Sequence, residues 1–221
     1  MRRALFPVAV LAVGAMSLTG CGDEDSGGGN TAAGGESGKV LRKASPATLH
    51  SVRAATPTQR DAARLGTPKK ARLWARPGDD EGTPPAICDY ADDVCTSLVA
   101  FGVGDYKDKE ISTRQTQFEI YGYPSRGAAR SAQQRYVAYN HSDEERDALR
   151  PRKIPVEGAE SAKGFEMGPG GSLKGYSVIV QQGSYMADVE VRADDAKDLK
   201  GLKAVQKAAE LQLAKITAAD K

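Results

Sequence analysis

The clearest structural pattern in the chain is the stretch GYSVIVQQGSYMADVEVR, residues 175–192. Apolar and polar side chains alternate in it on each side of Gln182-Gly183. The apolar members of the alternation are Tyr176, Val178 and Val180, followed by Tyr185, Ala187, Val189 and Val191. Alternation with a period of two predicts strands, and glycine supplies the positive φ that a tight turn requires. The stretch therefore predicts a β-hairpin.

The residues that follow this hairpin predict an amphipathic helix. Its apolar side chains recur at helical spacing and form one stripe: Leu199, Leu202, Val205, Ala209, Leu213 and Ile216. Asp194 or Asp195 is the expected N-cap. A helix with one apolar stripe needs a surface to pack against, and we expect that surface to be a sheet.

Two segments upstream of the hairpin predict further strands. Residues 97–104, SLVAFGVG, are typical of a buried strand that ends at glycine. The segment Gln117–Tyr123 predicts another strand, with Phe118 and Ile120 on one face.

A helix is expected after the second of these strands. It starts at Ser125, a candidate cap, and its small and apolar side chains recur at helical spacing: Ala128, Ala129, Ala132, Tyr136 and Val137. The helix ends near Asn140 or continues as a polar helix to Leu149.

Two dipeptides nearer the N-terminus predict short helices. Ser45-Pro46 and Thr56-Pro57 each place an N-cap residue before a proline at the first helical position, and Gly66 ends the second helix. Helices thus alternate with strands along the chain, and an antiparallel hairpin lies among them. This order predicts a single α+β domain in which helices pack on a mostly antiparallel sheet.

The stretch from about Phe118 to Lys215 resembles a known group of proteins in the order and spacing of its elements. A strand and an Ala-rich helix precede Gly158-Ala-Glu-Ser-Ala162, the hairpin with Gln182-Gly183-Ser184, and a closing helix. This order is similar to that of small actinobacterial lipoproteins and of the extracellular sensor domains of some actinobacterial Ser/Thr kinases. The resemblance implies a sheet-and-helix cup with a cleft for a ligand or a protein. The chain departs from the kinase domains in having one candidate disulfide, in a different place, and no kinase portion.

The N-terminus has the features of an export signal. Arg2-Arg3 precedes an uncharged run from Ala4 to Met16, which is too short to cross a hydrocarbon core of about 30 Å. The tetrad Leu18-Thr-Gly-Cys21 resembles the lipobox at which prolipoproteins receive a diacylglyceryl group on the cysteine sulfur. The resemblance implies fatty acyl groups such as palmitate on Cys21. The alternatives are an ordinary secretory cleavage after Gly20 and, because of Arg2-Arg3, twin-arginine rather than Sec export.

The chain divides into three expected segments. They are a signal peptide at 1–20, the lipidated Cys21 with a flexible linker at 21–39, and the α+β domain at 40–221. The linker is rich in Gly, Ser, Asp and Glu and has almost nothing to bury, which is typical of a tether. We therefore expect the domain at the extracytoplasmic face of the cell membrane, anchored through the lipid on Cys21.

The chain has three cysteines. Lipidation accounts for Cys21 and leaves the even pair Cys88 and Cys95 in an oxidising compartment, so these two are expected to form a disulfide. The spacing of the pair differs from a CxxC redox motif, and metal ligation would need more Cys or His nearby. No metal and no cofactor are expected.

The net charge gives no support to a nucleic-acid partner. The 31 basic and 29 acidic residues nearly balance once the two signal arginines are removed, whereas nucleic-acid binding requires a strongly basic domain. The stretch from Arg42 to Arg76 is basic and residues 79–110 are acidic. We interpret both as solvated faces, and the alternative is a basic face that rests on anionic lipid headgroups.

The sequence lacks the short motifs of several enzyme classes. Gly-x-Ser-x-Gly, His-Glu-x-x-His, the P-loop pattern and Ser-x-x-Lys are all absent, which disfavours serine esterases, zincins, P-loop enzymes and penicillin-recognising enzymes. Gly102-Val-Gly104 begins like a dinucleotide loop but lacks the third glycine, so we interpret it as a strand end. His50 and His141 are expected at the surface rather than as catalytic bases.

Two further groups of residues have a structural and a functional interpretation. One is the acidic group Asp79, Asp80, Glu81, Asp89, Asp92 and Asp93, which does not follow the EF-hand pattern and is interpreted as a solvated loop rather than a calcium site. The other is the aromatic group Trp74, Tyr106, Tyr121, Tyr123, Tyr136 and Tyr139, which can line a cleft for sugar or lipid. For each aromatic residue, packing in the core is the prediction.

These observations predict a non-enzymatic, sensor-like module that binds a small apolar ligand or an envelope protein. Two alternatives stay open. One is a hydrolase that acts on the cell wall through a pair of carboxylates, since two acids at a suitable separation suffice for glycosidase chemistry. The other is a purely structural envelope protein.

Overall fold

The computed structural model describes residues 44–58, 60–61, 67–75, 85–89, 92–108, 113–142, 149–167, 174–195, 199 and 201–221. They belong to a compact unit, Leu41–Lys221. The predicted signal peptide, the expected lipidation site Cys21 and the predicted linker lie outside the described residues. Within the described part of the chain, no helix combines the length and the apolar character needed to cross a membrane.

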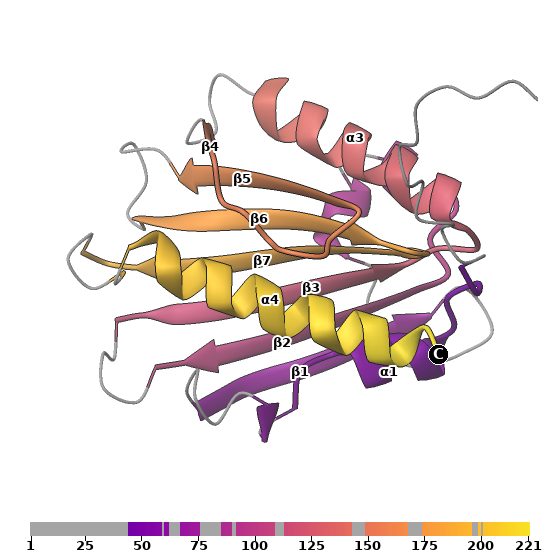
Figure 1. Cartoon of the computed structure of the whole chain (residues 1–221), viewed down its shortest axis with the longest axis horizontal. Coiled ribbons are helices and arrows are strands. Elements are labelled where there is room, and N and C mark those ends of the chain that lie inside the picture. Colours follow the sequence, from indigo (N-terminus) through magenta and orange to yellow (C-terminus); the bar gives the residue numbers. More distant parts are fainter. Residues whose placement is uncertain are drawn as a thin grey trace, which may run out of the picture. The chain divides into compact units, whose positions relative to one another are not determined.

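The domain is built on a seven-stranded sheet with the order β1-β2-β3-β7-β6-β5-β4, and every neighbouring pair is antiparallel (Figure 1). The strands are β1 (Thr67–Ala75), β2 (Ala100–Lys107), β3 (Gln115–Gly122), β4 (Arg150–Arg152), β5 (Ser161–Met167), β6 (Lys174–Gln182) and β7 (Tyr185–Ala193). The helices are α1 (Leu49–Ala55), the 3-10 helix η2 (Ala86–Asp89), α2 (Asp92–Cys95), α3 (Arg126–Ser142) and α4 (Leu202–Ala219). The α+β prediction is confirmed.

The hairpin predicted from residues 175–192 is formed by β6 and β7. Gln182 pairs with Tyr185, so the loop consists of Gly183 and Ser184, and Gly183 has a φ of 55°. The strands bury side chains on both faces, with Val178 on one face and Ile179 on the other. The hairpin therefore lies in the middle of a sheet that is covered on its two sides.

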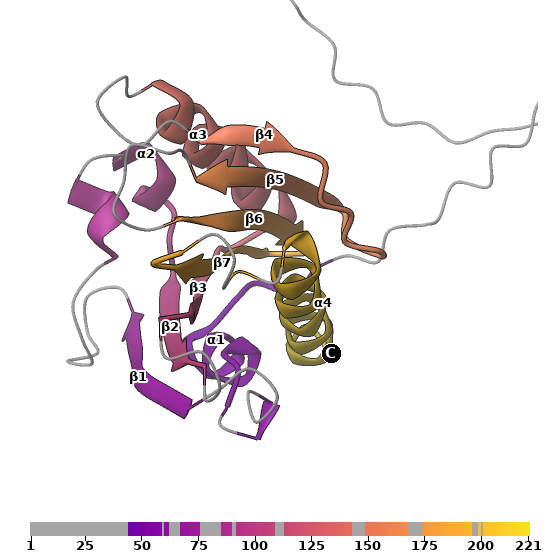
Figure 2. The same cartoon turned by 90° about the vertical axis from the view of Figure 1, so that its left-hand side faces the viewer.

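Helices cover the two faces of the sheet separately, as the end-on view in Figure 2 shows. Helices α1 and α4 pack on the first face, where Val205, Leu213 and Ile216 of α4 join the core built around Phe118 and Ile120. Helices α2 and α3 pack on the second face. The second core consists of Val94, Leu98, Phe101, Val103, Tyr121, Tyr123, Ala129, Ala132, Tyr136, Phe165, Ile179 and Met186.

The starts of α1 and α4 differ from the predictions. Helix α1 is capped by Thr48, whose side chain accepts from the backbone N–H of Ser51 at 3.1 Å, so Ser45-Pro46 does not begin it. The cap of α4 is Gly201 with a φ of 67° and no side-chain cap, rather than Asp194 or Asp195. Those aspartates follow β7 directly, and the chain runs further before the helix starts.

Two smaller predictions also need correction. Leu202 at the first turn of α4 is 38% exposed, although the rest of the predicted stripe is buried. Strand β2 does not end at Gly104 but continues to Lys107. Glycine at position 104 leaves room for the Tyr106 ring, because a Cβ there would lie 3.1 Å from Tyr106 Cε2.

Other predicted elements match within a few residues. Strand β3 covers the predicted segment Gln117–Tyr123 except for Tyr123, and Phe118 and Ile120 lie in the first core. Helix α3 begins after Ser125, whose Oγ accepts from the N–H of Ala128 at 3.2 Å. Helix α3 ends at Ser142, and residues 143–148 lie outside the described part. The helix predicted from Thr56-Pro57 to Gly66 also lies partly outside the described residues, and Pro57 is not helical.

Candidate functional site

An open pocket of about 640 Å³ lies at the edge of the sheet, where β5 meets β4 and α3. We call it the β5 pocket. The residues that line it are Val137, Pro151, Arg152, Lys153, Ile154, Pro155, Val156, Ala162, Lys163, Gly164 and Phe165. Its volume falls in the range of about 300–1,000 Å³ that is usual for small-molecule sites.

The local sequence explains why the chain leaves a pocket here. Strand β4 has three residues and contains Pro151, which lacks an N–H and is tolerated in an edge strand. After Arg152 the chain leaves the ladder and crosses close to β5 at Gly164. A Cβ at position 164 would lie 2.6 Å from the Arg152 carbonyl oxygen and 2.7 Å from Ile154 Cγ1. Only glycine permits this approach without a shift of the crossing segment.

The floor of the β5 pocket is apolar. Ile154, Val156 and Phe165 are 5%, 8% and 2% exposed, so they are anchored in the two cores while part of their surface lines the pocket. Val137 on α3 and Ala162 on β5 are only partly buried. An apolar group that enters the pocket would remove surface of these side chains from water.

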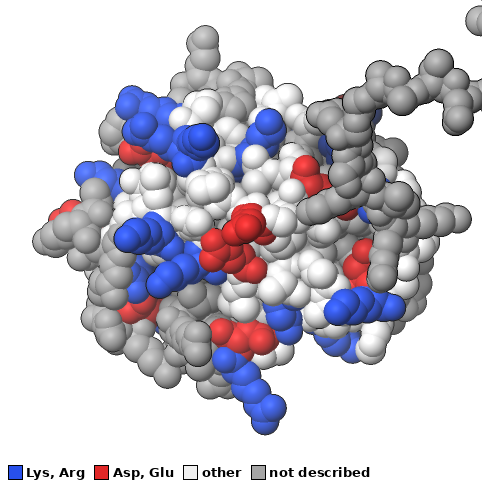
Figure 3. All heavy atoms as spheres, in the orientation of Figure 1, with Lys and Arg blue, Asp and Glu red and all other residues white. Residues whose placement is uncertain are grey.

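The rim of the β5 pocket is basic. Three of the eleven lining residues are basic, namely Arg152, Lys153 and Lys163, and none is acidic. We call these three the basic rim. Arg152 Nε donates to Glu166 Oε2 at 2.5 Å, whereas neither lysine forms an ion pair with a described residue. Figure 3 shows Lys and Arg side chains gathered over the end of β4, at the upper left of this face.

A second polar feature lies on the second face of the sheet and consists of Glu119, Asp188 and Glu190. We call it the carboxylate cluster. Glu119 on β3 is the register partner of Asp188 on β7, so their side chains share one face. Asp188 accepts from Tyr136 Oη at 2.8 Å and from Ser177 Oγ at 2.6 Å.

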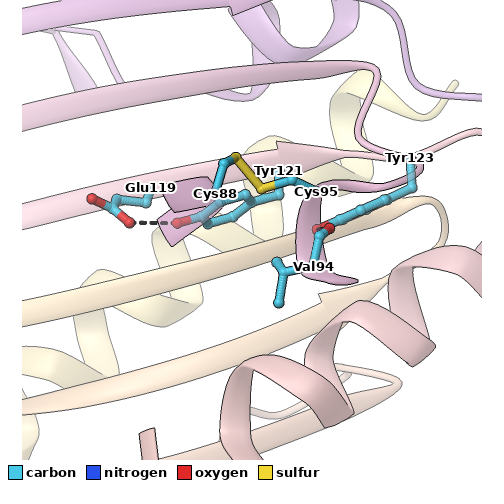
Figure 4. The surroundings of a disulfide bond; sticks show 6 residues. All are labelled: Cys88, Val94, Cys95, Glu119, Tyr121 and Tyr123. Atoms are coloured by element: carbon cyan, nitrogen blue, oxygen red, sulfur yellow. Dashed lines mark hydrogen bonds between the residues drawn. A yellow bond between two sulfur atoms is a disulfide. The ribbon is translucent and has the colours of Figure 1, made fainter. Parts of the chain in front are cut away.

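The other two carboxylates of the cluster also have partners. Glu119 Oε2 accepts from Tyr121 Oη at 2.6 Å, as the dashed line in Figure 4 shows, and its Oε1 accepts from Gln117 Nε2 at 3.2 Å. Glu190 forms an ion pair with Arg192. The cluster thus joins β3, β7, β6 and α3 through hydrogen bonds between buried or partly buried groups.

Burial raises the pKa of each carboxylate in the cluster. Loss of hydration raises the pKa of Glu119 to about 7, with a smaller contribution from the charge of Asp188, although the hydrogen bond from Tyr121 lowers it. Desolvation likewise raises the pKa of Asp188 and of Glu190, and the Arg192 guanidinium opposes both shifts. Arg192 is the one cation that opposes these shifts in the three carboxyl groups. Near neutral pH the cluster therefore retains protons that solvent-exposed carboxyl groups would have lost.

The disulfide Cys88–Cys95 staples η2 to α2, with a Cα–Cα distance of 5.5 Å, and it is the pair expected from the sequence. Both cysteines pack against the second core, which contains Tyr121 and Tyr123 (Figure 4). Tyr123 Oη donates to the Val94 carbonyl at 3.1 Å, which fixes α2 on the sheet. The disulfide is therefore part of the scaffold beneath α3 rather than part of the pocket lining.

The remaining residues singled out in the sequence lie elsewhere. Tyr106, Tyr121, Tyr123 and Tyr136 are buried in the cores, as predicted. His50 is exposed on α1. Asp93 pairs with Arg135 on α3 at 3.6 Å, and no group of three metal-ligating side chains occurs among the described residues. Cys21, Asp79, Asp80, Glu81 and the side chains of Trp74, Asp92 and His141 lie outside the described part.

Sequence reasoning identified neither the pocket nor the carboxylate cluster. The pocket depends on where residues 151–156 cross β5, which no local pattern shows. For the cluster a signal did exist, because Asp188 and Glu190 alternate with Ala187, Val189 and Val191 in β7, the central strand of the sheet. Charged residues on the second face of a central strand indicate a buried polar network when helices cover that face.

No family model matches this chain, and no curated protein is similar to it in sequence. Among solved structures, the fold is similar to the extracellular domain of PknH from Mycobacterium tuberculosis. The two chains are 11% identical, the match covers 78% of this chain and 98% of the PknH domain, and the TM-score is 0.50. PknH is a Ser/Thr kinase. The resemblance to kinase sensor domains that the sequence predicted is therefore confirmed at the level of the fold.

Proposed function

We propose that this chain is a non-enzymatic, sensor-like binding module of the cell envelope that holds a small ligand in the β5 pocket. The observation that carries the proposal is the pocket itself, because an apolar floor beside a few convergent polar groups is the usual construction of a ligand site. The similarity to an extracellular kinase domain supports the extracytoplasmic part of the proposal through the fold alone.

The test uses a pair of tryptophan substitutions on α3. Val137→Trp places a large side chain in the pocket, whereas Ala138→Trp places the same side chain on the exposed face one position away. The full-length proteins are purified from cell envelopes and compared by native mass spectrometry. We expect a bound small molecule on the wild type and on Ala138→Trp, and its loss from Val137→Trp. An unliganded wild type, or equal ligand on both variants, would contradict a site in the β5 pocket.

The proposal includes a lipid anchor on Cys21. The lipobox-like tetrad Leu18-Thr-Gly-Cys21 behind a short apolar run supports it. Labelling with a fatty-acid analogue should mark the wild-type chain and not Cys21→Ser, which should leave the membrane fraction or keep its signal peptide. Unchanged labelling and fractionation of the Cys21→Ser variant would argue against the anchor.

A second candidate function is a hydrolase that uses the carboxylate cluster. The raised pKa of Glu119, about 7, is the observation that favours it, because a protonated carboxyl group near an ionised one can act as a general acid. The intramolecular partners of all three acids favour a structural role instead. Release of peptidoglycan fragments by the wild type, lost in Glu119→Gln but not in the exposed control Glu210→Gln, would establish the hydrolase.

A further inference from the structure

We propose that the β5 pocket selects a single-chain amphipathic anion, with the carboxylate or phosphate headgroup on the basic rim and the apolar chain on the floor. This inference rests on the proposed function, since it names the class of ligand that the pocket takes. It goes further in predicting that charge, and not apolar character alone, decides which molecule binds.

The basic rim of the β5 pocket favours a negatively charged ligand. Lys153 and Lys163 are exposed and form no ion pair with a described residue, and the carboxylate of Glu166 is engaged by Arg152. An anion that binds between the two lysines gains charge-assisted hydrogen bonds and breaks no existing pair. A cation in the same position would face the two lysine charges and find no acidic lining residue.

The apolar floor and the volume of the pocket indicate that the ligand carries an apolar chain. Ile154, Val156 and Phe165 are apolar lining residues next to the rim, and Val137 lines the pocket from the side of α3. A fully polar anion such as inorganic phosphate would leave the apolar surface of the pocket exposed to water. A volume of about 640 Å³ suits one chain of moderate length rather than a lipid with several acyl chains.

The residues of the basic rim converge from both sides of the crossing at Gly164. Lys153 follows β4, and Lys163 on β5 precedes the glycine at which the crossing segment lies closest. The hydrogen bond between Arg152 and Glu166 holds the end of β4 against β5. Lys153 and Lys163, which pair with no described acidic residue, therefore flank an opening at the edge of the sheet, and their long side chains can adapt to the headgroup.

The experiment uses three photoreactive probes with the same ten-carbon chain and a terminal diazirine: a carboxylate, an alcohol and a trimethylammonium. Each is cross-linked to the full-length protein, and the labelled peptides are identified by mass spectrometry. The carboxylate should label peptides of β4, β5 and α3 about tenfold more than the other two probes do. Its labelling should fall as the salt concentration rises, because the lysines are exposed, and that of the alcohol should not.

Matched charge reversals distinguish the effect of the basic rim on probe binding from the effect of the protein's net charge. Lys153→Glu with Lys163→Glu should reduce carboxylate labelling about tenfold, whereas Lys203→Glu with Lys207→Glu, exposed on α4, should leave it unchanged. If the first double variant fails to fold, Lys153→Gln with Lys163→Gln replaces it. Equal labelling by the alcohol or the ammonium probe, or full labelling of the rim variant, overturns the proposed ligand class.

The outcomes distinguish this inference from the proposed function on which it rests. A neutral ligand that co-purifies with the wild type and is lost from Val137→Trp overturns the anionic class while the binding module stands. Absence of pocket labelling by every probe, together with an unliganded wild type, overturns both.

Discussion

The side chain of Glu160 accepts a hydrogen bond from the backbone N–H of Gly183, with 3.2 Å between Oε1 and the nitrogen. Its other oxygen accepts from Gln181 Nε2 at 3.2 Å and pairs with Arg126 Nε at 3.0 Å. Through these contacts Glu160 connects the loop before β5 with the turn of the central hairpin and with the start of α3. Its side chain is 8% exposed, so these partners replace water.

Glu160→Gln should destabilise the protein by about 1–3 kcal/mol, because the amide cannot accept hydrogen bonds at both former oxygens and loses the pairing with Arg126. Glu157→Gln, an exposed change in the same loop, is the control and should shift stability by less than about 0.5 kcal/mol. Urea unfolding of both variants measures the effect. Equal midpoints would show that Glu160 does not stabilise the turn.

The central hairpin could be predicted because its pattern is local. Val178, Val180, Ala187 and Val189 alternate in sequence, and Gly183 marks the turn. Strand β5 could not be predicted this way, since it lies next to the short edge strand β4 and carries exposed Lys163 beside Gly164. Of its seven residues only Phe165 is buried, so no alternation of apolar residues marks it.

Strand β1 and the functional features were missed for a different reason. The segment 67–75 contains three basic residues and from sequence is only part of a charged stretch, although its backbone pairs with β2. The β5 pocket depends on contacts between segments that are separate in sequence, such as Val137 and Ile154. The single α+β domain was predictable, whereas the site required the tertiary structure.

The carboxylate cluster should make stability fall as pH rises. Burial raises the pKa of Glu119 from 4.5 to about 7, so the folded state binds more protons than the unfolded state between these values. Stability contributed by the protonated group is complete below about pH 4.5 and is lost as pH rises through 7. Glu119→Gln, which mimics the protonated form, should therefore gain on the order of 2 kcal/mol relative to wild type between pH 4.5 and pH 8.

Thermal and urea unfolding across this pH range measure the difference between variant and wild type. Glu210→Gln makes the same charge change on the exposed surface of α4 and should keep a constant difference from wild type. A Glu119→Gln difference that is also independent of pH would contradict a raised pKa of Glu119 in the folded state.

The disulfide should stabilise the packing of η2 and α2 on the second face. Cys88 and Cys95 are separated by seven positions, and closing so short a loop contributes roughly 2.5 kcal/mol in the loop-entropy model. Replacing both cysteines by serine should lower the free energy of unfolding by about this amount. Addition of a reductant should destabilise the wild type and leave the double variant unchanged. An equal response of the two proteins to reductant would contradict a stabilising bond.

Gly164→Ala should disturb the β5 pocket directly. The added Cβ would lie 2.6 Å from the Arg152 carbonyl oxygen, so the crossing segment must move, at a cost of about 1–3 kcal/mol. Gly127→Ala is the control, because a Cβ there has no neighbour closer than 3.9 Å and lies in the first turn of α3, where alanine should stabilise. Denaturation midpoints that rank the two variants in the opposite order would refute the tight crossing.

The central claim, that a ligand occupies the pocket between β5 and α3, is tested most directly by hydrogen–deuterium exchange of the full-length protein with and without a lipid extract of the cell envelope. A bound ligand slows local opening of the segments that hold it. We predict that amides of residues 150–156 and 161–165 and of α3 around Val137 exchange more slowly with the extract, while α1 and α4 are unchanged. Protection confined to α1 and α4, or no protection anywhere, would contradict the account.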